Sequence, residues 1–297
     1  MLFYFIYWLI SPILWLMLFL TTIINPKVRH HWRNEKKTLN VVKQKIKNNN
    51  KVIIHLHSAS MGEFEQLKPV INEINRNKYF ILLSFFSPTG FKKQRNITIV
   101  DAVCYHPFDF IWSAFFFFKK LNIQHYITTR NDIWPNHLFV AKKLNIPTAL
   151  INANFYKKSH KNSFLIKMIY KQVFKNIDMV LTGSERLKTN LQLLCSNKKI
   201  HITGDSRIDQ VIKRKNDNQS NLLPNIYKES TTIIFGSIEP SDEKFLFNSL
   251  KELYPNGSLD LKNKKHCLII VPHEIFPKNI NKIYQELKKN KFKSNLL

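Results

Sequence analysis

A group of polar side chains follows an early apolar run and has the composition of a catalytic acid–base site. His57, Ser58 and Ser60 come first, and Glu63 follows where a strand should give way to a helix. Glu63 could act as a general base, and the polar residues before it could orient its carboxylate. A carboxylate in the first turn of a helix is also a common capping residue, because the helix dipole stabilises it. The sequence alone leaves both roles open.

Glycine is scarce in this chain, and its few positions are informative. Of six glycines in 297 residues, Gly62, Gly183, Gly204 and Gly236 each come soon after a predicted strand. Gly62 is expected to let a buried strand turn sharply into a helix. Ligands of open α/β sheets bind at the carboxyl ends of strands, where glycine lets backbone approach closely and helix N-termini attract anions. Ordinary strand-to-helix turns would explain any one of these glycines equally well.

From about residue 51 onward, short β-rich apolar runs alternate with stretches of helical periodicity. The strand runs lack strict polar alternation, which indicates strands buried on both faces and a mostly parallel sheet covered by helices. The polar segment 213–225 is the predicted linker to a second strand–helix series. The first series has the strands KVIIHLH, YFILLSFFS, AVCYHPF, QHYITT, IPTALINAN, DMVLTGS and KIHITG and helices over 63–76, 110–121, 133–144, 160–176 and 185–195. The second has strands at 231–237 and 266–274 and helices over 240–253 and 277–289.

The first 24 residues carry no charged side chain, and about 20 apolar residues suffice to cross a bilayer. No basic stretch precedes this segment and no small-residue cleavage site follows it, so a membrane anchor is favoured over a cleavable signal peptide. Pro12 and several aromatic residues leave open a kinked helix lying partly in the membrane interface. The positive-inside tendency should keep the rest of the chain in the cytoplasm, given the basic residues Lys27, Arg29, Arg33, Lys36 and Lys37.

The net charge of +26, from 46 Lys+Arg against 20 Asp+Glu, points to an anionic partner such as a lipid surface or a phosphorylated substrate. A compositional excess of Lys, Asn, Ile and Phe would raise the charge without any such partner. The sequence has no RNA-recognition, zinc-finger or basic-zipper pattern, so no nucleic-acid partner is expected. The three cysteines lack metal-binding or disulfide spacing, and no metal or cofactor is expected.

Several motifs together resemble those of one enzyme family. The segment HSASMGE at 57–63 resembles the H-x-x-S-x-G-E signature of 3-deoxy-D-manno-octulosonic acid (Kdo) transferases. Other segments match that family's motifs in the family order and at plausible spacing, from the apolar N-terminus to the end of the chain. These segments are SFFSPTG (84–90), DIWPN (132–136), NAN (152–154), TGDSRID (203–209), GSIEPSDE (236–243) and VPHE (271–274).

The resemblance implies an α/β fold of GT-B type. It implies a membrane anchor helix at 1–26, an N-terminal Rossmann-like acceptor-binding domain with a parallel sheet at 27–215, and an incomplete Rossmann-like nucleotide-sugar domain at 216–297. The implied activity is inverting transfer of Kdo from CMP-Kdo to a lipid A precursor, lipid IVA, in lipopolysaccharide core biosynthesis. The implied place is the cytoplasmic side of the inner membrane, with the donor, the acceptor and inner-membrane lipids as partners and no metal required.

The resemblance also implies roles for individual residues. Glu63 matches the general base, Arg207 a cation that stabilises charge in the transition state, and Asp132 an acidic position of the family. Arg130 departs from the pattern, because many relatives have an acidic residue there. The other implied site residues are Pro272, His273, Gly236 and Ser237 for the donor and Ser60 and Gly62 for the acceptor, with His273 standing where the family has arginine.

The sequence stops at Leu297, before the G-G-S and G-G-H-N-x-x-E segments that complete the family's nucleotide site. A C-terminally truncated transferase is therefore expected, and the isolated chain should transfer Kdo poorly or not at all. The alternative is a non-catalytic, membrane-tethered protein that binds acidic lipid or a partner through its N-terminal domain.

Overall fold

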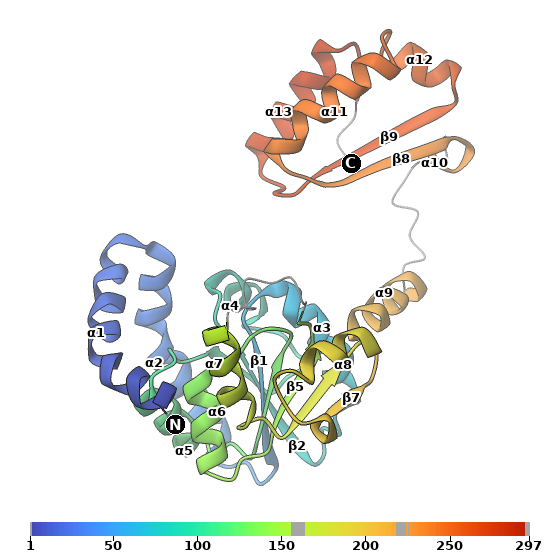
Figure 1. Cartoon of the computed structure of the whole chain (residues 1–297). Helices are drawn as coiled ribbons and strands as arrows, with labels where there is room; N and C mark the ends of the chain where they lie inside the picture. The colour runs from blue at the N-terminus through green and yellow to red at the C-terminus, as the bar shows by residue number, and fades with distance from the viewer. Residues whose placement is uncertain (1, 156–163, 218–223, 225, 295–297) are drawn as a thin grey trace. The chain divides into compact units, whose positions relative to one another are not determined.

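The computed structural model describes residues 2–155, 164–217, 224 and 226–294. It divides into two compact units, Met1–Asp217 and Asn218–Leu297 (Figure 1). The first unit contains a seven-stranded, wholly parallel sheet in the order β3-β2-β1-β4-β5-β6-β7. Its strands are β1 Val52–Ser58, β2 Tyr79–Phe85, β3 Ala102–Tyr105, β4 His125–Thr129, β5 Thr148–Ala153, β6 Met179–Thr182 and β7 Ile200–Ile202.

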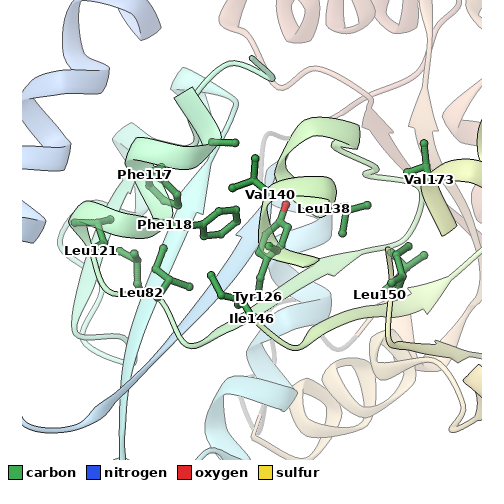
Figure 2. Packing of buried hydrophobic residues seen from close by; sticks show 14 of the residues in the cluster. Leu82, Phe117, Phe118, Leu121, Tyr126, Leu138, Val140, Ile146, Leu150 and Val173 are labelled. Atoms are coloured by element: carbon green, nitrogen blue, oxygen red, sulfur yellow. The ribbon is translucent and has the colours of Figure 1, made fainter. Parts of the chain in front are cut away.

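The central strands are buried on both faces, as the absence of strict polar alternation predicted. In β1 and β2, every residue after the first is buried. Helices cover the two faces with separate hydrophobic clusters, one of which includes Phe64 and Leu67 and the other Phe117 and Phe118. Figure 2 shows the rings of Phe117 and Phe118 in the second cluster, near Tyr126 of β4. The predicted parallel α/β sheet is therefore confirmed.

After β1, the helices of the first unit are α3 Met61–Glu73, α4 Pro88–Gln94, α5 Ile111–Lys120, α6 Pro135–Lys143, α7 Phe164–Phe174, α8 Glu185–Leu191 and α9 Ser206–Asp217, with a 3₁₀ turn at Asn197–Lys199. Five of them, α3, α5, α6, α7 and α8, follow predicted segments with bounds that differ by a few residues, although 160–163 of the predicted 160–176 helix lie outside the described residues. No helix was predicted at α4 or α9. The helix α9 runs through the first part of the predicted linker, so residues 213–217 are helical rather than irregular. Apart from Pro224, the rest of that predicted linker lies outside the described residues.

Two antiparallel helices precede the sheet, α1 (Leu2–Ile24) and α2 (Pro26–Ile46), and the sequence patterns did not predict α2. Asn25 joins them and caps α2, because its side-chain oxygen accepts hydrogen bonds from the first free amides of that helix. Arg29 of α2 donates to the last carbonyls of α1, at Thr22 and Ile23. In the second turn of α2, both ring nitrogens of His31 lie 2.9 Å from backbone oxygens of Phe86 and His106, beside the sheet. The helix pair is thus fixed to the sheet unit through α2.

The first two turns of α1 are also fixed to the sheet unit. Tyr7 donates to the backbone oxygen of Asp109 at 3.0 Å, and the indole of Trp8 donates to Asn136 at 2.8 Å. The covered residues recur every three or four positions along the whole helix, which is the spacing of one helix face. They are Phe3, Tyr4, Tyr7, Trp8, Ser11, Leu14, Leu18 and Thr22.

The length and composition of α1 would suffice to cross a membrane. A helix that crosses on its own would be open to lipid on all sides and would have its ends on opposite sides of the bilayer. In α1, one face is covered from end to end, and both ends are held to the same unit. One face of α1 thus lies against the rest of the first unit, and its other face is apolar and exposed.

We predict that α1 stays docked when the chain binds vesicles. Cysteines introduced at Trp8 and Asn136 should be joined by a short bifunctional thiol reagent with and without lipid, because the two side chains touch. A pair at Leu16 and Asn136 is the control, since Leu16 is exposed on the outer face of α1. Crosslinking of the first pair only in the absence of vesicles would mean that α1 leaves the sheet unit to cross the bilayer.

The second unit is built on two parallel strands, β8 (Thr231–Ile238) and β9 (His266–Pro272). Its helices are α10 Ile226–Glu229, α11 Pro240–Leu253, α12 Ser258–Asn263 and α13 Pro277–Lys289. Leu246 and Phe247 of α11 and Ile283 of α13 form a small core with apolar residues of the strands. Other strand residues, such as Ile234 at 62% exposure, lie outside that core.

Candidate functional site

Glu63 takes part in the helix cap that its position suggested. Ser60 is the N-cap of α3, and its hydroxyl accepts from the amide of Glu63 at 3.4 Å. One carboxylate oxygen, Oε2 of Glu63, accepts from the amide of Ser60 at 3.1 Å, which completes a capping box. The capping role is therefore real, and it uses Oε2. The half-buried carboxylate is also held in one orientation at the carboxyl end of β1.

The sequence analysis expected glycine at position 62 to be needed for a sharp turn from strand to helix, and this expectation is wrong. Gly62 lies within the first turn of α3, does not have a positive φ, and a Cβ there would meet nothing closer than the Ser60 hydroxyl at 4.0 Å. The turn from strand to helix therefore does not need a glycine. The free space above Gly62 leaves room for a molecule to approach the helix N-terminus. Gly90 is different, because a Cβ there would lie 2.7 Å from the ring of Phe85.

Asp132 and His57 meet beside Glu63. The atoms Nε2 of His57 and Oδ2 of Asp132 are 2.8 Å apart, although the approach is not linear. The two groups are in close contact, but among the described residues neither atom has a hydrogen-bond partner of acceptable geometry. The other oxygen of Asp132 accepts from the indole of Trp134 at 2.9 Å. Trp134 thus orients the carboxylate, and Pro135 begins α6.

A buried histidine cluster stands behind this pair, and the sequence reasoning missed it. The parallel register places Ser84 of β2 beside His57 of β1. Its hydroxyl oxygen lies 2.7 Å from His55, 2.8 Å from His57 and 3.4 Å from His106, all fully buried. Burial lowers the pKa of His55 and His106 well below the ordinary value, which keeps both rings neutral at neutral pH. The one local sign was the pair of histidines at i and i+2, on the same face of β1.

The same three histidines, His55, His57 and His106, could be considered as metal ligands, because their donor atoms lie within 4.8 Å of one another. Their rings converge instead on the hydroxyl of Ser84, at hydrogen-bond distances. Zinc–nitrogen bonds are about 2.0–2.1 Å long, and a metal at this point would have to displace that hydroxyl. The geometry fits a hydroxyl-centred hydrogen-bond cluster that fixes the ring of His57 towards Asp132.

The surroundings of Glu63 raise its pKa above the ordinary value. Burial is the largest cause, and the charge of Asp132 adds to it. His57 and the backbone hydrogen bonds of the cap act in the opposite direction but do not outweigh these causes. A carboxylate with a raised pKa accepts a proton more readily, which suits a general base.

Arg207 lies at the start of α9, which packs against α3. Its guanidinium forms an ion pair with Asp205. Burial would raise the pKa of Asp205, but hydrogen bonds from Arg207 and the charges of Arg207 and Arg130 outweigh it and lower the pKa. Arg130 thus adds its positive charge to the cationic group around Asp205.

Hydrogen bonds fix the start of α9 to the rest of the first unit. Ser206 donates to the backbone oxygen of Gln66 in α3 at 2.6 Å and accepts from Asn152 at 2.7 Å. Asn152 has a positive φ of 51° at the end of β5, so its amide reaches across to α9. The elements that carry Glu63 and Arg207 are therefore joined directly, through contacts that the sequence analysis did not predict.

The four residues expected at the donor come together within the second unit. Gly236 and Ser237 lie just before the end of β8, Pro272 ends the neighbouring β9, and His273 follows it. The hydroxyl of Ser237 lies 2.7 Å from Nδ1 of His273, and both side chains are exposed. Ser237 has a positive φ of 61°, an uncommon conformation for a residue with a side chain. A Cβ at Gly236 would meet nothing within 4 Å, which leaves the backbone open.

Comparison with known proteins identifies the family. The model of the family described as 3-deoxy-D-manno-octulosonic-acid transferase (kdotransferase) matches residues 30–210, which is more than half of the chain. This chain belongs to the Kdo transferase family. The transferase of Haemophilus influenzae is 24% identical over 248 residues, covering 80% of this chain and 55% of the relative. That of Rickettsia bellii is 25% identical, covering 85% of this chain and 59% of the relative.

This Kdo transferase family member therefore spans little more than half the length of these relatives. Among solved structures, the Staphylococcus aureus MnaA–UDP complex aligns with a TM-score of 0.57 at 11% identity, covering 80% of this chain and 65% of that chain. A UDP-N-acetylglucosamine 2-epimerase aligns with a TM-score of 0.58 at 10% identity, covering 84% of this chain and 69% of that chain. At such low identity the likeness concerns the fold alone, and it confirms the predicted GT-B-type α/β fold.

We predict that Asp132→Asn lowers the pKa of Glu63. The substitution removes the negative charge that raises this pKa, while burial keeps it above the ordinary value. The measurement is a carbon-13 NMR titration of glutamate-labelled protein, with Glu63 assigned by its loss in Glu63→Gln. Asp178→Asn is the control, because it removes a carboxylate that pairs with Lys142 and is not among the causes of the raised Glu63 pKa. An unchanged or raised Glu63 pKa in Asp132→Asn would contradict the assigned electrostatics.

Proposed function

We propose that this chain is part of an inverting Kdo transferase in lipopolysaccharide core synthesis, with CMP-Kdo as donor and lipid IVA as acceptor. Family membership supports a glycosyltransferase. The observation that carries the site is Glu63, a fixed carboxylate with a raised pKa in the first turn of α3, just after β1.

In the proposed step, Glu63 removes the proton from an acceptor hydroxyl through Oε1, because Oε2 is engaged in the cap. The hydroxyl oxygen forms a bond to the anomeric carbon of Kdo from the face opposite the leaving group. The bond between that carbon and the phosphate oxygen breaks, and CMP leaves with the electron pair. Asp132 keeps the proton affinity of Glu63 high, and His57 orients Asp132.

In this scheme, other residues stabilise the charge of the leaving group and bind the two substrates. Arg207 is proposed to stabilise negative charge as the donor phosphate leaves, and its pairing with Asp205 holds it ready. Gly236, Ser237, Pro272 and His273 are proposed to bind the donor nucleotide. Ser60 and Gly62 are proposed to border the acceptor, since the space over Gly62 is open.

The acceptor is a lipid, so the proposed place of action is a membrane surface. The apolar outer face of α1 and the net charge of +26 suit an anionic bilayer. We propose the cytoplasmic side of the inner membrane, where a nucleotide sugar is available. A non-catalytic protein that binds acidic lipid with the same N-terminal unit is the second candidate, because the apolar face of α1 and the positive charge would serve such a protein equally well.

We predict that Glu63→Gln reduces Kdo transfer from CMP-Kdo to lipid IVA by about 10²–10⁴-fold, the usual contribution of a general base. Glutamine can keep the capping box, so the fold should persist. Glu65→Gln in the same helix turn is the matched control, and it should leave the chemical step unchanged. Equal, measurable turnover by Glu63→Gln and the unaltered chain would contradict the assignment of the base.

A binding arm of the experiment separates the two candidate functions. Lipid IVA affinity is measured without donor for the unaltered chain and for Glu63→Gln. Transfer that depends on Glu63 supports the enzyme. Acceptor binding of both proteins with no transfer, even at high protein concentration, would favour the binding protein.

A further inference from the structure

The outer face of α5 carries a set of exposed aromatic residues that the fold does not require. Trp112, Phe115 and Phe116 are 40%, 42% and 53% exposed, and Lys119 and Lys120 follow them. We call these five residues the α5 outer face. The opposite side of α5 is already filled by Ala114, Phe117 and Phe118, which pack in the core.

The exposed rings are arranged as a surface. The ring of Trp112 stacks on Phe110, with centroids 4.9 Å apart and planes inclined by 5°. The ammonium group of Lys120 lies over the ring of Phe116, 5.2 Å from its centroid. Contiguous exposed apolar groups on a soluble protein are unfavourable and commonly mark a binding surface.

This face adjoins the docked end of α1. Tyr7 of α1 bonds to Asp109, which lies two residues before α5 begins. Figure 1 shows α5 beside the N-terminal end of α1. The first turns of α1 also carry exposed apolar side chains, including Leu2, Phe5 and Leu9. The α5 outer face therefore belongs to a helix that begins beside the docked end of α1.

The chemistry of the face points to a lipid bilayer. Tryptophan and phenylalanine rings insert at the boundary between headgroups and acyl chains, and lysines beside them attract anionic phosphates. We propose that the α5 outer face is a second lipid-contacting surface, which binds anionic bilayers together with α1. Its rings enter the interface, and Lys119 and Lys120 contact headgroup phosphates. This inference rests on the proposed membrane attachment.

Two contacts with the bilayer would hold the first unit in one orientation more firmly than one. If α1 alone touched the lipid, the unit could rotate about α1, and the position of Glu63 relative to the lipid would vary. A second contact on α5 restricts that rotation, because α1, α5 and α6 are joined through Asp109 and Asn136. The carboxyl edge of the sheet would then keep a constant orientation towards a lipid acceptor.

An environment-sensitive fluorophore on a single cysteine tests the contact. The full chain carries Cys195→Ser and Cys267→Ser, while Cys104 is buried and stays. The probe is placed at Phe116, with Leu16 of α1 as the reference for lipid contact and Phe245, 72% exposed in the second unit, as the reference for water. Vesicles of phosphatidylglycerol and phosphatidylcholine carry a quencher in the acyl region.

We expect the probes at Phe116 and Leu16 to shift to the blue and to be quenched on vesicles, and the probe at Phe245 to remain unchanged. Quenching at Leu16 but not at Phe116 would overturn the second surface while leaving the membrane proposal intact. Quenching at neither position would overturn both. The probe at Phe116 replaces an exposed side chain, so the fold should persist.

A separate pair of double variants tests whether Lys119 and Lys120 bind anionic headgroups. Lys119→Gln with Lys120→Gln should weaken binding to anionic vesicles by about 5-fold for each lysine at low salt, with little effect on neutral vesicles. Lys288→Gln with Lys289→Gln is the control, because these lysines also end a helix, α13 of the second unit. Equal losses in the two double variants would show a general charge effect and would overturn the specific role of α5.

Discussion

The carboxylate of Asp109 joins the parts of the first unit that matter for function. It is only 11% exposed, and a carboxylate in such a place must be hydrogen-bonded to be tolerated. It accepts from the first amides of α6, at Asn136 and His137, and from the ring of His137. It also accepts from Tyr7 of α1. The helix α6 has no cap of its own side chains, so Asp109 supplies it from a distant loop.

From Asp109 the polar contacts continue to the candidate catalytic residue. The ring of His137 packs against His106, with centroids 4.2 Å apart, and His106 shares the hydroxyl of Ser84 with His57. His57 contacts Asp132, and the charge of Asp132 acts on Glu63. Every member of this series lies near the carboxyl end of a strand or the start of a helix. A parallel sheet brings these ends together, which explains why a site forms there.

Much of the architecture could be predicted from local patterns. The strand runs were recognisable because burial on both faces removes polar alternation, and the helices after them because their inner faces repeat at helical spacing. The helix α2 escaped prediction, because its mean composition is polar and only a few residues, such as His31 and Val42, are buried. The linker was misjudged at 213–217, because this polar stretch continues as the last turns of α9, whose start is fixed to α3. The reason given for Gly62 was wrong because the helix forms there with ordinary backbone angles.

The sequence by itself determined the alternation of strands and helices, the apolar character of α1 and the family motifs that place Glu63 at a helix start. These depend on residue type and short-range spacing. Only the tertiary structure decided that α1 is covered along one face, that Asp132 meets His57, and that three histidines converge on Ser84. Those contacts join residues that are distant in sequence, and their partners follow from strand order and register. The pKa of Glu63 belongs to the second group, because burial and the charge of Asp132 both arise from folding.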